Sequence, residues 1–532
     1  MTEHEHDGID SPSRRNALRK LGTAAGLALA APRLLAAPGT GNAAATSANG
    51  PGEHPHILWI NLEGVPISVL SCYGSKLMDT PNIDRLAREG MRFENAFCTN
   101  ALCAPSRATL LTGKYDHLNG MIANDPGGGS TGEPVSRFDV AQETFPRIMQ
   151  RAGYQTTHAG KWHVTGTPGQ AGFDAFIYKD GAGGPYYAAG GYMENTARPG
   201  DGSVRHTSHA GYQTDILTDY AIAAIDRMAQ SGKPFLMSYQ PFSDHRPFDP
   251  PHRYDHIFDD HRFPEAGTFW DDYSHRAAAA REAHMRLADM PDFNPPGDLT
   301  RRQRQQWNHQ QFMRRFMANL KALDDSVGRL LDHLDQTGLA GRTIVVLSSD
   351  HGFFMGDHGW FDKRIMYEQA IRVPLMVRWP GRVKPGSVNG DWTFNIDNAP
   401  TTLAMAGLDI PADMQGKSIL PLLDGKTPAD WHRDLYYHYY EFGPPHFVFP
   451  HYGIRTQRHK LIYYYRVNEW ELFDLEKDPD EMESLFQHPD YKVLDGYQDV
   501  FEDLAERLRQ LRTRYADNSG IAPQIYPLPD YD

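Results

Sequence analysis

His56-Ile57-Leu58-Trp59-Ile60-Asn61 is the stretch of this 532-residue chain that decides its fold. It is short and nearly continuously apolar, which is typical of a buried parallel strand. Similar runs lie at Thr343 to Ser348, at Lys233 to Tyr239 and, more weakly, at Gly153 to His158. Helical patterns lie between them, the clearest being the apolar residues spaced by three or four from Phe312 to Leu334. Strands that alternate with helices predict an α/β fold: a large, mostly parallel sheet sandwiched by helices.

Ionisable residues follow each of the four predicted strands. In parallel sheets, ligands bind at the carboxyl ends of the strands, so these residues are expected to meet at one edge. Any one of the groups could be a solvated loop, but four at the same edge predict a functional site. The groups are Glu63 after the first run, Asp350-His351 after the second, Asp244-His245-Arg246 after the third, and Lys161-Trp162-His163 after the fourth.

The sequence pattern changes after Leu423. Trp431 to Tyr440 and Gly453 to Tyr465 are aromatic, strand-like runs, and Val500 to Tyr515 has the pattern of an amphipathic helix. We therefore expect four parts: a signal and linker at 1–52, a catalytic domain at 53–423, a smaller α+β domain with an antiparallel sheet at 424–515, and an irregular tail at 516–532.

The N-terminal segment predicts export. Arg14-Arg15 is followed by the weakly apolar run from Leu21 to Ala31 and then by small residues. This order matches a twin-arginine signal, and the run is too short for a stable transmembrane anchor. Cleavage at Ala43 to Ala45 or at Ala36-Ala37 remains open. The expected partner is the twin-arginine export machinery, and the expected location is periplasmic or secreted.

Charge and cysteine content narrow the classes of function. The formal net charge of −14 argues against general nucleic-acid binding, which calls for a basic face, but it does not exclude an anionic small substrate. The cysteines, Cys72, Cys98 and Cys103, are too few for a disulfide-rich scaffold. A buried apolar thiol is the ordinary interpretation of each.

At Cys103 the neighbouring residues favour another interpretation. The run from Cys103 to Lys114 begins Cys-Ala-Pro-Ser-Arg and continues into Leu-Thr-Gly. It resembles the signature of the formylglycine-dependent sulfatases of the alkaline phosphatase superfamily. Further landmarks follow in the family's order: Gly160-Lys161-Trp162-His163, Asp350-His351-Gly352, Lys363 within Phe361 to Arg364, and Phe473 to Pro479. The resemblance runs from about Pro55 to the terminal helix.

The resemblance implies a mechanism and a site. A maturation enzyme would oxidise Cys103 to formylglycine, whose hydrate attacks sulfur with one hydroxyl and expels sulfate through the other. It also implies one calcium ion, which would lower the pKa of the diol and orient the ester. The implied catalytic residues are Cys103; Arg107 and Lys161, which hold diol and sulfate; His163, which takes the second proton; and His245 and Lys363, which bind sulfate and protonate the leaving alcohol. The implied metal ligands are Glu63, Asp350, which is also the expected base, His351 and Cys103.

One departure from the family pattern concerns the metal. Alignment on Cys72-Tyr73-Gly74 places Glu63 and Gly64 where the family has two adjacent aspartates. Glycine has no carboxylate, although Glu63 could bind calcium with both oxygens. Either the site binds metal differently or catalysis has been lost. Because the other residues that need a metal beside them are all present, we expect an active enzyme.

Aromatic and histidine residues near the C-terminus suggest the substrate. Tyr436 to Glu441, His446 and Arg455 lie in a region similar to that of bacterial N-acetylglucosamine-6-sulfatases, although a packed sheet would also be rich in tyrosine. We expect a sulfated carbohydrate, with His446 and Arg455 as substrate-binding residues. The alternatives are a phosphate or phosphonate ester hydrolase of the same superfamily, and a non-catalytic protein that binds sulfated glycans.

Overall fold

A computed structural model describes residues 54–124, 135–179, 186–187, 190–195, 204–487 and 492–518. The predicted export signal lies outside these residues. One large sheet dominates the described chain, with its strands in the order β12-β2-β11-β8-β1-β7-β3-β4-β5-β6. In chain order its strands are β1 (His56–Leu62), β2 (Met91–Phe97), β3 (Gln155–Gly160), β4 (Ala175–Lys179), β5 (Tyr192–Asn195), β6 (Arg205–Thr207), β7 (Phe235–Gln240), β8 (Thr343–Ser349), β11 (Leu375–Arg378) and β12 (Ser387–Phe394).

The four strands predicted from the sequence form the centre of this sheet. β8, β1, β7 and β3 are adjacent and parallel, with Ile57 opposite both Ile344 and Leu236. Antiparallel pairings occur further out, between β11 and its two neighbours and among β4, β5 and β6. The prediction of a large, mostly parallel sheet is therefore confirmed.

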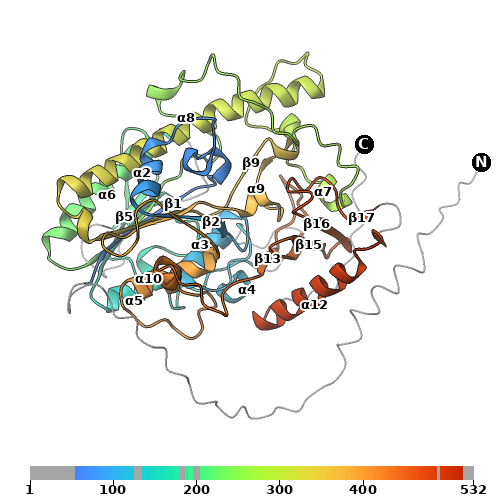
Figure 1. Cartoon of the computed structure of the whole chain (residues 1–532). Helices are drawn as coiled ribbons and strands as arrows, with labels where there is room; N and C mark the ends of the chain where they lie inside the picture. Colours follow the sequence, from blue (N-terminus) through green and yellow to red (C-terminus); the bar gives the residue numbers. More distant parts are fainter. Residues whose placement is uncertain are drawn as a thin grey trace, which may run out of the picture. The chain divides into compact units, whose positions relative to one another are not determined.

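Helices cover both faces of the sheet, because alternate residues of the buried strands point to opposite sides. Leu58 and Ile60 of β1 pack in one cluster with residues of α2 (Pro81–Glu89), α6 (Gln213–Gln230) and α8 (Arg301–Gln336). Ile57 and Trp59 pack in the other, with residues of α3 (Cys103–Thr112), α5 (Phe145–Arg151) and α10 (Asn398–Met405). The two groups of helices lie on opposite sides of the sheet in Figure 1.

The long helix α8 shows how the sequence sets its limits. Thr300 accepts a hydrogen bond from the backbone of Gln303, whose side chain bonds back to the N-cap, so a capping box starts the helix. Its buried residues include Phe312, Phe316 and Leu320, spaced as the sequence pattern requires. Among the described residues, no helix combines the length and apolar character needed to cross a membrane.

A second, smaller sheet follows near the C-terminus. It is antiparallel, in the order β13 (Leu435–Tyr439), β14 (His451–Arg455), β15 (His459–Tyr464) and β16 (Glu469–Asp474), and α12 (Gln498–Arg514) packs against it. The strand-like run Gly453 to Tyr465 contains the end of β14 and all of β15, joined by a turn. Side chains of this sheet share a hydrophobic cluster with the main sheet, so the boundary at residue 423 stays a prediction.

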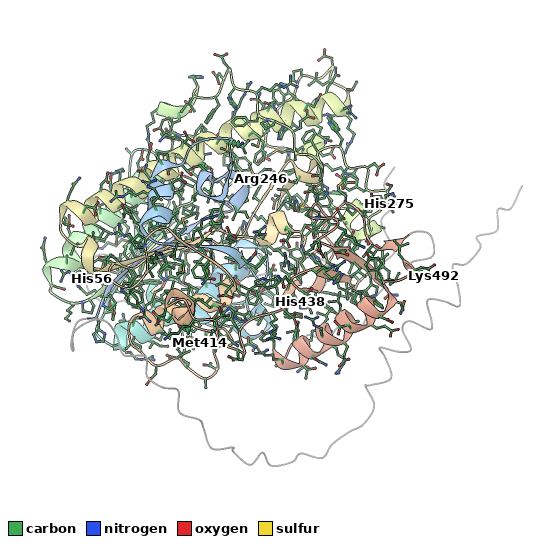
Figure 2. The ribbon with its side chains drawn as sticks, viewed as in Figure 1. His56, Arg246, His275, Met414, His438 and Lys492 are labelled. Carbon is green, nitrogen blue, oxygen red and sulfur yellow. The ribbon has the colours of Figure 1, made fainter. Side chains whose placement is uncertain are left out.

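Figure 2 places His56, at the start of β1, far from Arg246, which follows the carboxyl end of β7.

Short elements complete the described chain. The short elements are α4 (Asp116–Asn119), α7 (Ala278–Arg281), α9 (Glu368–Ile371), α11 (Leu420–Leu423), β9 (Phe354–Met355), β10 (Phe361–Asp362), β17 (Phe486–Gln487) and β18 (Lys492–Val493).

Candidate active site

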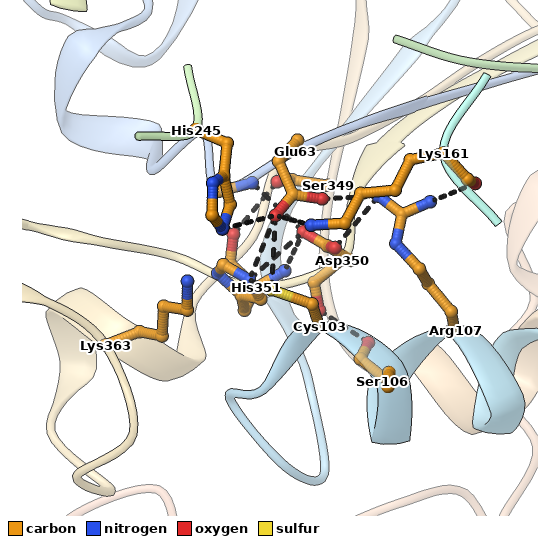
Figure 3. Close-up of polar contacts among 12 residues, drawn as sticks. Glu63, Cys103, Ser106, Arg107, Lys161, His245, Ser349, Asp350, His351 and Lys363 are labelled. Atoms are coloured by element: carbon orange, nitrogen blue, oxygen red, sulfur yellow. Dashed lines mark hydrogen bonds and ion pairs between the residues drawn. The ribbon is translucent and has the colours of Figure 1, made fainter. Parts of the chain in front are cut away.

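The carboxyl ends of the four central strands meet the start of α3. Cys103 is the first residue of α3 and is fully buried. Glu63 directly follows β1, Asp350 directly follows β8, and Lys161 directly follows β3. Figure 3 shows these side chains converging on one point. The structure therefore brings together groups that lie far apart in the sequence, at the edge where the sequence predicted a site.

Cys103 lies among acids, bases and fixed cations. Its Sγ is 3.2 Å from Oε1 of Glu63 and 3.4 Å from Nε2 of His351. Burial by itself raises the pKa of the thiol, but the charges of Lys161 and Lys363 outweigh it and hold that pKa well below its usual value. The thiol is thus unlike an inert core cysteine. By contrast, burial and the charge of Asp350 raise the pKa of Cys98.

Glu63 is the counter-charge for two buried cations. Its Oε1 accepts a hydrogen bond from Lys161 at 2.7 Å, and its Oε2 accepts one from Arg107 at 2.5 Å. Arg107 also pairs with Asp350 at 3.0 Å. Burial and the Cys103 thiolate raise the pKa of Glu63, but the charges of Lys161 and Arg107 lower it by more. The pKa of Glu63 therefore lies well below its usual range. The result is a buried network of alternating charges.

His351 presents its second ring nitrogen to the same point. Its Nδ1 donates to the carbonyl of Gly352 at 2.8 Å, so Nε2 can carry the lone pair. That Nε2 is 3.5 Å from Oδ1 of Asp350 and 3.9 Å from Oε1 of Glu63. The donor atoms of Glu63, Cys103, Asp350 and His351 all lie within 4.8 Å of one another. Two carboxylates and an imidazole nitrogen that face one another in this way fit a divalent cation.

Gly64 contributes no side chain to this cluster. Its backbone N–H donates to Oδ1 of Asp350 at 3.0 Å. A Cβ added at Gly64 would lie 3.1 Å from Cε1 of His351, and the residue has a φ of +62°. The departure from the family pattern at this position is therefore built into the packing of the site.

The other predicted catalytic residues surround Cys103. His163 and His245 both interact electrostatically with Cys103, and Nε2 of His245 is 4.0 Å from Oε1 of Glu63. Burial lowers the pKa of both histidines. Lys363 lies 5.5 Å from the ring centre of Phe353. Burial lowers the pKa of its ammonium, but the charges of Asp362 and Cys103 raise that pKa by more, so Lys363 stays protonated.

The two predicted substrate-binding residues lie in different surroundings. His446 is buried, and its Nε2 is 3.2 Å from Oδ2 of Asp362, the residue before Lys363. Arg455 instead donates to both oxygens of Glu368 at 3.2 Å and covers the rings of Phe97 and Trp392 at 5.2 and 4.7 Å. The structure thus brings His446 beside the site, whereas the contacts of Arg455 include none of the residues around Cys103.

Several residues at the site were missed from the sequence. Arg364 donates to Glu441 at 3.0 Å, and Glu441 accepts from the backbone of Asn124 at 2.9 Å. Arg364 directly follows Lys363, so its position in the motif was the one available signal. Asp362 was given no role for the same reason: it stands next to Lys363, the residue that the family pattern names.

Strained backbone conformations occur in the same loops. Residues other than glycine have positive φ at His163 (55°), Asp244 (76°), Asp362 (77°) and Arg364 (103°). Such conformations persist only where the surrounding structure enforces them, and they gather at functional sites. Each lies within two residues of a predicted catalytic side chain.

Solved structures with the same arrangement of sheet and helices define the class. The phosphonate monoester hydrolase of Agrobacterium radiobacter superposes with a TM-score of 0.66 at 20% identity, which shows the fold alone, an alkaline phosphatase-like α/β fold. A solved structure of a protein in complex with its substrate D-glucosamine-2-N,6-O-disulfate superposes with a TM-score of 0.78 at 37% identity, over 88% of this chain and 100% of that one.

The family follows from the sequence comparisons. Residues 55–408 match the sulfatase family model, and residues 356–514 match the model described as N-sulphoglucosamine sulphohydrolase, C-terminal. The chain is 38% identical to the N-acetylglucosamine-6-O-sulfatase of Bacteroides thetaiotaomicron over 88% of both chains. It is 27% identical to an arylsulfatase of Clostridium perfringens, over 88% of this chain and 97% of that one. The chain belongs to the sulfatase family and is a sulfuric ester hydrolase.

Proposed function

We propose that this sulfatase removes the 6-sulfate of an amino sugar, with residue 103 as formylglycine. The observation that carries the proposal is the setting of Cys103: a buried, activated thiol at a helix start, between fixed cations and a cluster suited to a divalent cation. The amino-sugar assignment is supported by the 38% identical N-acetylglucosamine-6-O-sulfatase and by the similar structure that binds a glucosamine disulfate.

The aldehyde, when formed, supplies a hydrated nucleophile for sulfur, and the residues around it handle charge and protons. Lys161 and Arg107 are fixed cations at 2.7 and 2.5 Å from Glu63, and they can neutralise charge that develops on sulfate oxygens. Lys363 keeps its proton and adds a third positive charge. His163 and His245, whose pKa values are lowered by burial, are neutral bases placed at residue 103.

The divalent cation of this proposal is calcium, as in the family that the sequence resembles. Glu63, Asp350 and His351 would hold it together with residue 103. When bound, calcium would supply Lewis acidity to the nucleophile and the ester. The Gly352 carbonyl accepts a hydrogen bond from Nδ1 of His351 and so favours the tautomer in which Nε2 can act as a metal ligand.

The buried polar residues beside Lys363 suit a sugar ring. Asp362, His446 and Arg364 are each at most 6% exposed, and they form a wall of hydrogen-bonding groups next to the catalytic ammonium. Sugar hydroxyls need such paired donors and acceptors. We assign this wall to the amino sugar, with His446 as one contact.

Sulfate release tests the proposal directly. Protein produced with a formylglycine-generating enzyme is given N-acetylglucosamine-6-sulfate, its 3-sulfate isomer, an aryl sulfate and an aryl phosphonate. The 6-sulfate is expected to have the highest kcat/KM, and Cys103→Ala is expected to be inactive, whereas Cys98→Ala serves as the matched control. Mass spectrometry of the tryptic peptide 93–107 is expected to locate the aldehyde at residue 103. Dominant phosphonate turnover would overturn the proposal.

We also propose export to the periplasm or beyond by the twin-arginine route, which Arg14-Arg15 and the apolar run that follows support. Replacing both arginines with lysine is expected to keep the protein in the cytoplasm. Cell fractionation with antibody detection measures this, and unchanged export of the variant would contradict it.

A further inference from the structure

Arg246 carries hydrogen-bond donors that the described part of the chain does not use. It directly follows His245, in the loop after β7, and Figure 2 labels its position. Its Nε donates to Oδ1 of Asp292 at 2.7 Å. Neither of its Nη groups has an acceptor among the residues that the structure describes, and the side chain is 23% exposed. The two Nη groups of a guanidinium form a planar fork that fits a sulfate or a carboxylate, so Arg246 is equipped to bind an anion.

The ring of Phe361 joins Arg246 to the wall that we assigned to the amino sugar. The guanidinium carbon of Arg246 lies 5.5 Å from the centre of this ring, and the His446 ring packs edge-on against it with the ring centres 6.2 Å apart. Asp362 is the next residue along the chain, and its Oδ2 is 3.2 Å from Nε2 of His446. Arg246 and the wall therefore pack on the same aromatic side chain, shortly before Lys363.

The wall balances its own charge without Arg246. Oδ1 of Asp362 is 3.6 Å from the ammonium of Lys363 and 3.8 Å from Nε of Arg364. Burial lowers the pKa of His446 to about 3, so its ring is neutral. Nδ1 of His446 is buried and has no hydrogen-bond partner within the described residues. A buried nitrogen of this kind calls for a ligand, and a sugar hydroxyl is a suitable one.

The surroundings of Phe361 thus suit two kinds of group on one ligand. His446 suits a hydroxyl group, and the unused Nη groups of Arg246 suit a negative charge. In the proposed function, the ester sulfate at residue 103 is already served by Lys161, Arg107 and Lys363. The charge on Arg246 is therefore left for a second anion.

We propose that Arg246 binds a second anionic group of the substrate, so that the enzyme prefers a doubly charged amino sugar to one that carries the 6-sulfate alone. Two groups supply this chemistry: a sulfate on the amino nitrogen of the same sugar, and the carboxylate of a neighbouring sugar unit. The bond from Nε to Asp292 orients the guanidinium and leaves both Nη groups for the anion. The inference rests on the proposed function, because it concerns the same substrate.

Substrates that differ in charge test the inference on the matured protein. Sulfate release is followed with N-acetylglucosamine-6-sulfate, with glucosamine that bears sulfates on its nitrogen and on O6, and with a disaccharide that joins a uronic acid to N-acetylglucosamine-6-sulfate. The unmodified chain is expected to have a kcat/KM roughly tenfold to a hundredfold higher for at least one doubly charged substrate, mainly through a lower KM, because hydrogen bonds between charged groups are strong. The preferred substrate identifies the source of the anion.

Arg246→Met removes the charge and keeps an unbranched side chain that can pack on Phe361. It is expected to lower the ratio of kcat/KM between the doubly and the singly charged substrate to about one. This ratio does not depend on how much of the variant folds, because both substrates meet the same preparation. Arg253→Met is the matched control: both Nη groups of Arg253 pair with Asp215, at 2.7 and 3.0 Å, so its substitution is expected to leave the ratio unchanged.

The outcomes are distinguishable. Equal kcat/KM values of the unmodified chain for the singly and doubly charged substrates would overturn the inference and leave the proposed function intact. A preference that Arg246→Met retains would place the anion at another residue and also overturn the inference. If the unmodified chain released no sulfate from any of the three substrates, the proposed function would fail, and the inference with it.

Discussion

Replacement of Glu63 by glutamine tests the charge network at the centre of the site. The change keeps the shape of the side chain and removes its charge. Lys161 and Arg107 then lose a partner at 2.7 and 2.5 Å while remaining buried. One of the two oxygen positions becomes an NH₂ group, which faces a cation with a donor.

The magnitude follows from these distances. At an effective dielectric constant of about 20, one charge pair at the Lys161–Glu63 distance of 2.7 Å is worth about 6 kcal/mol. Asp350, 3.0 Å from Arg107, keeps part of the balance. Removal of one partner from a buried pair costs about 3–5 kcal/mol. With an unfolding entropy of about 1 kcal/mol per kelvin for a chain of this length, Tm is expected to fall by about 3–5 °C.

The loss in activity is expected to exceed the loss in stability. Lys161 and Arg107 would shift from the positions that the carboxylate sets, and the cation would lose a ligand. Loss of one preorganised charge typically costs about 10²–10³ in rate, so kcat/KM for sulfate release should fall by at least this factor.

Calorimetry and sulfate-release kinetics measure the two effects on the same preparation. Glu143→Gln is the control, because Glu143 forms its ion pair with Arg151 at the surface, with a side chain 39% exposed. Its substitution is expected to cost no more than about 0.5 kcal/mol. A Glu63→Gln protein with unchanged Tm and with kcat/KM within about twofold would refute the assignment of Glu63 as the shared counter-charge.

Three further predictions concern pH, backbone and the C-terminal sheet. Burial lowers the pKa of His451 to about 3, and its Nε2 accepts from the backbone of Met366, so the unfolded chain gains a proton near pH 6.5 that the folded chain refuses. The free energy of unfolding is therefore highest above pH 6.5 and falls as the pH falls, by up to about 1.4 kcal/mol per pH unit. His451→Gln is expected to reduce the slope of this free energy, measured by denaturant unfolding, against pH. Gly160 directly precedes Lys161, and a Cβ added at Gly160 would lie 1.8 Å from the carbonyl oxygen of Gln240. Gly160→Ala is therefore expected to abolish sulfate release and to lower Tm. Normal kinetics of this variant would contradict the prediction. Arg455→Ala is expected to lower the free energy of unfolding, measured by chemical denaturation, by about 1–3 kcal/mol and to leave KM unchanged, because Arg455 contacts Glu368 and Trp392. A raised KM would instead make Arg455 a substrate contact.

Much of the fold could be predicted because its signals are local. The four central strands are short apolar runs, and strands buried on both faces need no alternation. β1, β7 and β8 lie within a residue or two of the predicted bounds, and the weaker fourth run ends two residues later, at Gly160. The run Gly453 to Tyr465 was harder, because the turn at Thr456 to Arg458 has no glycine or proline to mark it.

The candidate site divides in the same way. Cys103, Arg107, Lys161, Asp350 and His351 were predicted because each lies in a motif with several specified neighbours. Arg455 was assigned by region alone, and its pairing with Glu368 depends on where β14 lies relative to α9.

The sequence by itself determined the sheet, the motif at Cys103 and the order of the landmarks, because apolar periodicity and contiguous motifs act over a few residues. Only the tertiary structure decided which charges meet. Lys161 and Arg107 share one carboxylate, and His351 turns its Nε2 to Cys103. Electrostatic partners are set by distances of a few ångströms between residues as far as 248 positions apart, and that information appears only when parallel strands align their ends.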